Sequence, residues 1–227
     1  MRYYENMDLS KYYNSSWYDF AIRTVKELKL TGKGDIIFDV GAGNSVLKSK
    51  INELNSKWVG FDYKPRNKGI NEWNLDNSIP KNIDVNPDCI LLLEVLEHLL
   101  NPGMALNNIR KASKSGTYLI ISTPNPYWSV IRIKFFFKGV FPMFTNEDMD
   151  NNHHVFVVWP HVLYKLLKNN DFEILDSYTI GVKSKFPEFQ VHPVLIVKIL
   201  LFGIRRLIEF FDKKSKGMSY TVIAKKN

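Results

Sequence analysis

Near its start the chain reads Asp35-Ile36-Ile37-Phe38-Asp39-Val40-Gly41-Ala42-Gly43-Asn44-Ser45. The apolar run at 35–40 predicts a buried strand that enters a tight glycine turn. Apolar residues at helical spacing over 45–54 then predict a helix, and residues 57–62 predict a second strand. This order predicts a βαβ unit whose two strands are parallel and joined by a right-handed crossover.

Strands and helices continue to alternate along the chain. Apolar runs predict further strands at 70–75, 89–93, 117–122, 172–179 and 218–224. Helical spacing predicts a helix at 104–114 and another that begins at Pro160. We therefore expect a single α/β domain over residues 1–227, an α/β/α sandwich with a mostly parallel sheet of about seven strands.

Composition narrows the classes of protein and partner. Of the 227 residues, 45% are hydrophobic, which excludes a disordered chain. Lys and Arg exceed Asp and Glu by 31 to 23, so the net charge of +8 favours anionic partners: nucleic acid, anionic lipid or phosphorylated small molecules. The single cysteine, Cys89, excludes an internal disulfide and fits a reducing compartment.

The sequence shows no pattern for export or for spanning a membrane. Its start lacks an apolar stretch behind basic residues, so we expect no signal peptide. The longest apolar region, 194–204, is interrupted by Lys198 and is too short for a membrane span. We expect a cytoplasmic protein, with peripheral contact to a membrane as a further option.

The glycine turn and a distal acid form a candidate ligand site. A strand followed by Gly-x-Gly and a helix lets the backbone approach a ligand closely. Asp62, at the tip of the second strand, is placed to accept both hydroxyls of a ribose. A dinucleotide fits less well, because Val46 stands where its third glycine belongs and Asp39 would repel a pyrophosphate. An ordinary βα turn is the alternative interpretation.

Four stretches in order resemble the class I S-adenosylmethionine-dependent methyltransferases. Phe38–Ser45 resembles their first motif and Gly60–Tyr63 their second. Asp88–Leu99 and Tyr118–Pro126 are similar to motifs of the subgroup that contains ubiquinone-biosynthesis O-methyltransferases. The likeness runs from about residue 34 to 180 and includes the strand near the end of the chain. It implies a Rossmann-like fold with an antiparallel last strand, and S-adenosylmethionine as cofactor.

The resemblance also implies which residues bind that cofactor. Asp39 and the turn of Gly41, Ala42 and Gly43 would hold the methionine part, with Asp62 on the ribose and Tyr63 against the adenine. The remaining candidates are Asn74, Leu75 and Glu94. The chain departs from the family in two places: Ser45 replaces a frequent glycine, and Asn74 stands where an acid often contacts the adenine, with Asp76 nearby.

Glu97 and His98 are the candidate catalytic residues. They follow Glu94 by three and four positions, which places all three side chains on one side of a helical turn. A carboxylate and an imidazole there can deprotonate an acceptor hydroxyl. The alternative is that Glu94 orients the cofactor while His98 only caps loop backbone.

A metal site is a further alternative at the same place. His154 precedes Pro160 by six residues, which resembles the subgroup's histidine before its penultimate helix. Glu94, Glu97, His98 and His154 together would offer two carboxylates and two imidazoles to a divalent cation. A similar set occurs in small-RNA terminal 2′-O-methyltransferases. We assign no metal ligand from the sequence.

Two segments stand outside the alternation and are interpreted as additions around the substrate entrance. Residues 127–152 form an insertion whose first part mixes aromatic and basic residues, and residues 192–216 project as one amphipathic helix. We interpret the apolar face of that helix as core packing. The alternative is contact with a membrane, which predicts binding to anionic liposomes.

The function predicted from the sequence is S-adenosylmethionine-dependent O-methylation of a small, lipid-linked or glycan acceptor. One alternative is a 2′-O-methyltransferase that acts on an RNA terminus with metal assistance. Another is a non-catalytic scaffold that retains the cofactor fold.

Overall fold

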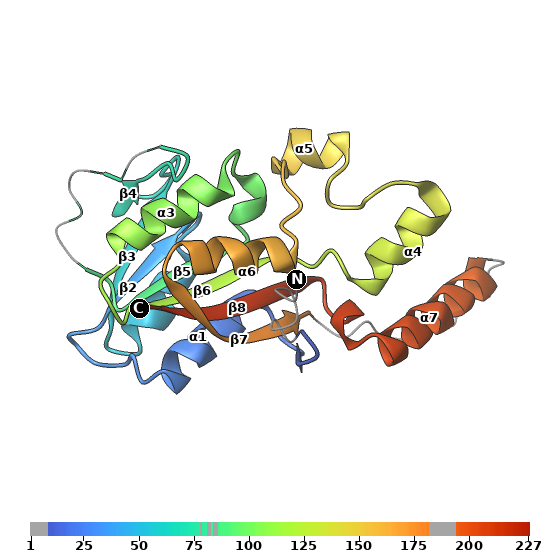
Figure 1. Cartoon of the computed structure of the whole chain (residues 1–227), viewed down its shortest axis with the longest axis horizontal. Helices are drawn as coiled ribbons and strands as arrows, with labels where there is room; N and C mark the ends of the chain where they lie inside the picture. Colours follow the sequence, from blue (N-terminus) through green and yellow to red (C-terminus); the bar gives the residue numbers. More distant parts are fainter. Residues whose placement is uncertain (1–8, 78, 81–82, 84–85, 182–193) are drawn as a thin grey trace.

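The structure is a computed structural model that describes residues 9–77, 79–80, 83, 86–181 and 194–227. Within these residues, eight strands form one sheet in the order β1-β7-β8-β6-β5-β2-β3-β4 (Figure 1). β8 is antiparallel to β6 and β7, whereas the other neighbouring strands are parallel. The strands are β1 (Tyr12–Tyr13), β2 (Ile36–Val40), β3 (Lys57–Asp62), β4 (Ile70–Glu72), β5 (Cys89–Leu93), β6 (Tyr118–Pro124), β7 (Phe172–Ile180) and β8 (Ser219–Lys226).

Helices cover both faces of the sheet (Figure 1). On one face, α1 (Trp17–Glu27) and α2 (Val46–Asn52) pack their apolar sides against β2 and β5. On the other face, α3 (Pro102–Ala112) and α6 (Pro160–Asn169) enclose the larger apolar core. The three-layer α/β/α arrangement with an antiparallel last strand is confirmed.

All seven strands predicted from the sequence are present, and β1 is an eighth. β1 has two residues and pairs only with the edge strand β7, so it carries no periodic pattern that a sequence analysis could detect. Helix α1 was also missed. Its signals are the N-cap Ser16, which accepts a hydrogen bond from the amide of Asp19, and the buried residues Phe20, Ala21, Thr24 and Val25 on one face.

The two additional segments lie at one edge of the sheet, where the parallel strands end. The chain leaves the carboxyl end of β6 and forms α4 (Ser129–Lys138) and then α5 (Asn146–Asn152). Helix α7 (Val194–Phe211) and the short 3₁₀ helix η2 (Lys213–Ser215) lead into β8, whose first residue, Ser219, pairs with Pro124. Figure 1 shows α4 and α7 side by side beyond the sheet. The start of the helix predicted at 192–216 lies outside the described residues.

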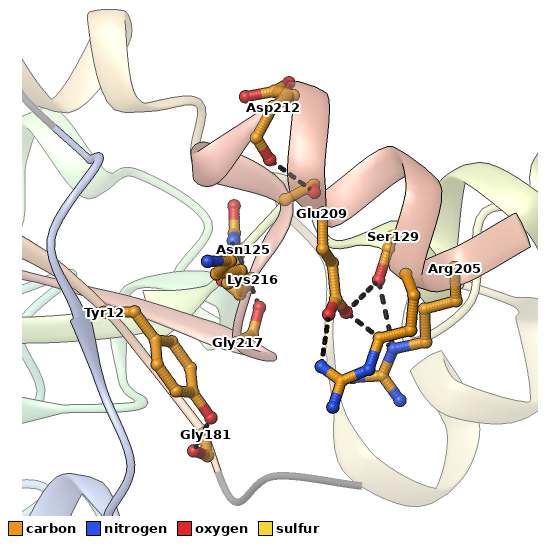
Figure 2. Close-up of polar contacts among 11 residues, drawn as sticks. Tyr12, Asn125, Ser129, Gly181, Arg205, Glu209, Asp212, Lys216 and Gly217 are labelled. Atoms are coloured by element: carbon orange, nitrogen blue, oxygen red, sulfur yellow. Dashed lines mark hydrogen bonds and ion pairs between the residues drawn. The ribbon is translucent and has the colours of Figure 1, made fainter. Parts of the chain in front are cut away.

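Helix α7 packs through its polar side, contrary to the core-packing interpretation. Glu209 is buried, and its carboxylate accepts hydrogen bonds from Ser129 of α4 at 2.8 Å and from Arg205 at 2.7 Å (Figure 2). Arg132 of α4 pairs with Asp212 at 2.6 Å. The apolar side of α7 faces away from α4 and is exposed. None of the described helices is long and apolar enough to cross a membrane.

Candidate active site

In the glycine turn after β2, the backbone at Gly41 lies close to the side chain of Val95. Gly41 has φ +85°, and a Cβ there would lie 2.4 Å from Cγ2 of Val95. The amides of Gly41 and Ala42 both donate to the carbonyl of Phe61, at 2.8 and 2.9 Å. The turn is therefore held against the end of β3, in a conformation that only glycine adopts without strain. Ser45, the substitute for the family's glycine, has a left-handed φ of +60°.

Asp62 lies directly beside this turn. Its Oδ2 accepts a hydrogen bond from the amide of Gly43 at 2.9 Å, and its Oδ1 accepts one from the amide of Lys64 at 3.0 Å. The carboxylate is thus oriented by backbone donors at the tip of β3. A carboxylate so placed can accept the hydroxyls of a ribose, as the sequence predicts.

Asp39 is buried in β2 and pairs with Gly60, two positions before Asp62 on the neighbouring strand β3. Its Oδ2 accepts a hydrogen bond from Nε1 of Trp58 at 3.0 Å. Burial raises the pKa of Asp39 to about 6, with a smaller rise caused by the charge of Asp62, while the bond from Trp58 lowers it. A buried carboxylate gains from a cationic ligand group. Trp58 was not among the predicted site residues, although it stands two positions before Gly60 on one side of the strand.

Val46 does not fill the packing site that the sequence argument gave it, because 45% of its surface is exposed. The argument against a dinucleotide therefore rests on the buried carboxylate of Asp39, which would meet a pyrophosphate with like charge.

Asn74, Leu75 and Asp76, the residues after β4 considered for contact with the adenine, lie in different surroundings. Both oxygens of Asp76 accept backbone hydrogen bonds, from Leu100 at 3.1 Å and from Asn101 at 2.9 Å, so Asp76 is committed to the loop before α3. Asn74 accepts one from the amide of Asp76 at 3.0 Å, and Leu75 is buried in the core. Tyr63 is 64% exposed, a ring surface available to a base.

Glu94 lies with Glu97 in an acid pair at the end of β5. Its Oε2 accepts from Ser219 of β8 at 3.2 Å, while its Oε1 is buried and has no partner among the described residues. Burial raises the pKa of Glu94 to about 7, although hydrogen bonds from Ser122 and Ser219 lower it. The backbone of Glu94 is left-handed, with φ +53°, which marks a strained turn. Its predicted contact with the cofactor stays a prediction.

Glu97, in the short 3₁₀ helix η1 (Leu96–His98), is fully buried. Oε2 accepts from Thr123 of β6 at 2.9 Å, and Oε1 has no partner in the described part of the chain. Burial raises its pKa well above the usual value, and the charge of Glu94 adds to the rise. A carboxyl group with a buried, orphaned oxygen is stabilised by protonation or by a nearby cation. Thr123 and Ser219 carry no sequence signal for this role.

The structure brings His154 to His98, with ring centroids 4.7 Å apart. Nδ1 of His98 lies 3.2 Å from the carbonyl oxygen of His153, and Nδ1 of His154 lies 2.7 Å from that of Met143. A carbonyl oxygen only accepts, so each Nδ1 carries a proton, and in a neutral imidazole Nε2 is then an acceptor. Burial, and next the charge of His154, lowers the pKa of His98 and favours its neutral form.

This cluster fits a divalent cation. Glu97, His98 and His154 each place a possible ligand atom within 4.8 Å of the others. The carbonyls that hold each Nδ1 are the outer-shell partners typical of metal-binding imidazoles. The orphaned oxygen of Glu97 would gain a positive partner. Glu94, the fourth ligand considered from the sequence, is not among the described residues whose ligand atoms meet here. The same arrangement without a metal provides a neutral base, so both sequence interpretations remain compatible with this geometry.

A hollow of about 620 Å³ lies between α4 and α5, beside the cluster. Trp128, Val130 and Pro142 give it an apolar wall, and lysines and acids line its rim. Met143, whose carbonyl holds His154, also lines it.

Comparison with solved structures supports the fold. An S-adenosylmethionine-dependent methyltransferase from Archaeoglobus fulgidus is 17% identical, with a TM-score of 0.59 over 92% of this chain and 94% of its own. One from Mesorhizobium loti is 16% identical, with a TM-score of 0.53 over 91% and 96%. The small RNA methyltransferase HEN1 is 15% identical, with a TM-score of 0.56 over 92% of this chain and 25% of its own.

The sequence matches no curated protein. A family model described as a methyltransferase domain matches residues 13–177, which span the sheet from β1 into β7 and include the glycine turn, Asp62 and the acid–imidazole cluster. The chain therefore belongs to the methyltransferase domain family.

Proposed function

We propose that the protein methylates a hydroxyl group on a small, lipid-linked or glycan acceptor. Membership in the methyltransferase domain family makes the protein an enzyme, and S-adenosylmethionine is its methyl donor. This donor supplies a methyl group on a positively charged sulfonium, which is already activated for transfer. The residues of the chain therefore have two tasks, to align the acceptor and to remove its proton.

The donor site is proposed at the glycine turn. The close approach at Gly41 leaves backbone room, and Asp39 and Asp62 offer carboxylates to the amine and the ribose respectively. Tyr63 offers a ring surface to the base. These assignments are supported by the placement of all four at the carboxyl ends of β2 and β3, where ligands bind in open α/β sheets.

The acid–imidazole cluster is the observation that carries the choice of a hydroxyl acceptor. Methylation of a hydroxyl releases a proton, which Nε2 of a neutral His98 can accept. Glu97 lies close to both imidazoles, and its ionised form would favour the charged imidazolium once it forms. A divalent cation held by Glu97, His98 and His154 would bind acceptor hydroxyls and lower their pKa.

A terminal ribose of RNA is the second candidate acceptor. The cluster offers the Glu97 carboxylate and two imidazoles, the net charge is +8, and the fold is similar to that of HEN1. RNA binding that weakens steeply as salt rises would favour this acceptor over the first.

Transfer of a labelled methyl group tests the function. The protein is incubated with methyl-labelled S-adenosylmethionine and cell lysate divided into lipid, RNA, protein and small-molecule fractions. Label in the lipid or small-molecule fraction supports the first candidate, and label in RNA supports the second. Asp62→Ala and His98→Asn should abolish labelling. A scaffold would transfer no label and gain no thermal stability from S-adenosylmethionine.

A further inference from the structure

Helix α7 exposes one continuous apolar face. Successive residues of a helix are rotated by about 100°, so its exposed apolar residues share one side. Leu200 is 62% exposed and Leu207 is 59% exposed. The others are Ile196, Val197, Ile199, Phe210 and Phe211, of which Phe210 and Phe211 are 76% and 77% exposed. Exposed apolar side chains in one contiguous patch mark an interaction surface.

The outward direction of this face is held by buried polar contacts. The side chain of Glu209 is only 6% exposed and accepts from Arg205, Arg206 and Ser129 (Figure 2). Burial raises the pKa of Glu209, but these hydrogen bonds outweigh it and hold the pKa below its usual value. Turning the apolar face inward would break the hydrogen bond from Ser129 to Glu209 and the ion pair of Arg132 with Asp212, the contacts that α4 supplies to this carboxylate side, at the cost of hydrogen bonds to charged groups.

The end of α4 carries further exposed apolar side chains near α7. Phe136 is 82% exposed, and its neighbours Phe135 and Phe137 are 54% and 63% exposed. Val140, just after the helix, is also exposed. Helix α4 contacts α7, so these aromatic side chains belong to the same end of the molecule (Figure 1). We call the exposed apolar residues of α4, Val140 and α7 the apolar platform.

Positive charge is concentrated in the segments that carry the apolar platform. Segments 129–138 and 194–216 contain nine lysines and arginines but only two acids, Glu209 and Asp212, and so supply +7 of the protein's net +8. Both acids are paired with arginines inside the α4–α7 contact. The lysines of these segments are Lys134, Lys138, Lys198, Lys213, Lys214 and Lys216, and none of them forms an ion pair within the described part of the chain.

We infer that the apolar platform docks on the surface of an anionic lipid bilayer. Phenylalanine and leucine side chains enter the boundary between headgroups and acyl chains, and the lysines contact anionic headgroups. A second copy of the chain fits less well, because a symmetric contact would oppose lysines with lysines. An anionic bilayer offers an apolar region to the exposed apolar side chains and negative headgroups to the unpaired lysines. The inference does not depend on which acceptor is methylated.

Docking would also orient the enzyme. The platform elements follow the carboxyl end of β6 and precede the paired start of β8, at the same sheet edge as the glycine turn and Glu97. The active site would therefore lie on the side of the protein that the membrane approaches.

Vesicle co-sedimentation of the full-length protein tests this inference. We expect binding to vesicles of phosphatidylcholine mixed with phosphatidylglycerol, weaker binding to phosphatidylcholine alone, and a decrease with added salt. Phe136→Ser with Phe210→Ser should weaken partitioning about tenfold or more. Leu175→Ser, which removes an exposed apolar side chain of β7, is the matched control and should bind as the wild type does.

Lysine variants separate the contribution of positive charge to vesicle binding from that of the apolar side chains. Changing Lys134, Lys138, Lys213 and Lys214 to Gln should remove the preference for phosphatidylglycerol, whereas Lys26→Gln with Lys33→Gln, both exposed elsewhere, should preserve it. Circular dichroism and thermal unfolding confirm that each variant folds. Failure of the wild type to bind phosphatidylglycerol vesicles at low salt would overturn the inference. So would self-association that the phenylalanine variant abolishes without any vesicle binding, because the platform would then be a dimer interface.

Discussion

The amide of Gly43 donates a hydrogen bond to the carboxylate of Asp62 over 2.9 Å, and so connects the turn after β2 to the tip of β3. The same two strands are joined in register from Ile36 and Lys57 onward. Together with the bond from the amide of Lys64 to the other oxygen, this bond orients the acid. The proposed ribose site thus depends on two backbone donors as well as on the acid.

Replacement of Asp62 should weaken cofactor binding. Asp62→Ala removes both the acceptor for the ribose and the bond to Gly43, so we expect about tenfold or greater loss of affinity for S-adenosylmethionine, corresponding to about 1.4 kcal/mol or more. Isothermal calorimetry measures the affinity, and the thermal shift with ligand checks it. Glu72→Ala, at the exposed end of β4, is the control. Equal affinity of Asp62→Ala and wild type would remove Asp62 from the site.

A methyl group at Gly41 should destabilise the protein. Gly41→Ala places a Cβ 2.4 Å from Val95 at φ +85°, so we expect a loss of about 2 kcal/mol or more in the free energy of unfolding. Urea denaturation measures the loss. Val95→Ala in the same chain should restore the part due to the clash, though not the part due to φ. Gly34→Ala has open space and should change stability by less than about 0.5 kcal/mol. Equal stability of Gly41→Ala and Gly34→Ala would contradict the close approach of Gly41 to Val95.

Glu94 should make stability depend on pH. Its pKa is about 7 in the folded chain, above the usual 4.5, so its contribution is fully present below pH 4.5 and is lost as pH rises through 7. Glutamine does not ionise, so Glu94→Gln removes this fall in the free energy of unfolding with rising pH. Because one pKa unit corresponds to about 1.4 kcal/mol, the variant should gain up to about 3 kcal/mol relative to wild type between pH 4.5 and pH 8.

Urea denaturation in metal-free buffer at several pH values measures this difference. Glu173→Gln, an exposed position of β7, is the control and should leave the pH profile unchanged. Parallel profiles of Glu94→Gln and wild type would show that the folded chain does not raise the pKa of this carboxyl group.

Divalent cations should bind the acid–imidazole cluster and release protons. Burial raises the pKa of Glu97 well above its usual value, so a cation that binds its ionised form displaces a proton. We expect calorimetric titration of metal-free protein with Mg²⁺, Mn²⁺ or Zn²⁺ to show binding whose heat depends on the buffer. Glu97→Gln and His154→Asn should weaken it about tenfold or more.

His153→Asn is the matched control for this titration. His153 contributes its carbonyl to His98, which the substitution keeps, and asparagine tolerates the left-handed backbone found there, φ +57°. Absence of binding by the wild type would leave His98 as a metal-free base. Equal binding by Glu97→Gln and wild type would place the cation elsewhere.

The sequence alone was sufficient to locate seven of the described strands along the chain and to predict the glycine turn. Both follow from local patterns: the buried strands β2, β5 and β6 are apolar runs, and Gly41 and Gly43 stand where positive φ is required. Helix α1 was missed, although its N-cap Ser16 and buried face are local signals too. The two-residue strand β1 has no pattern at all and exists only through its pairing with β7.

Contacts between distant segments decided the rest. Periodicity correctly indicated which residues of α7 share a face, but not which face is buried, because that depends on the polar partners Ser129 and Arg132 that α4 supplies. In the same way, the sequence placed Glu94 near a cofactor, while Ser219, brought across the sheet by β8, placed its carboxylate with Glu97. A pattern along the chain specifies local geometry; only packing selects the partner of each buried charge, since an unpaired one is too costly to retain.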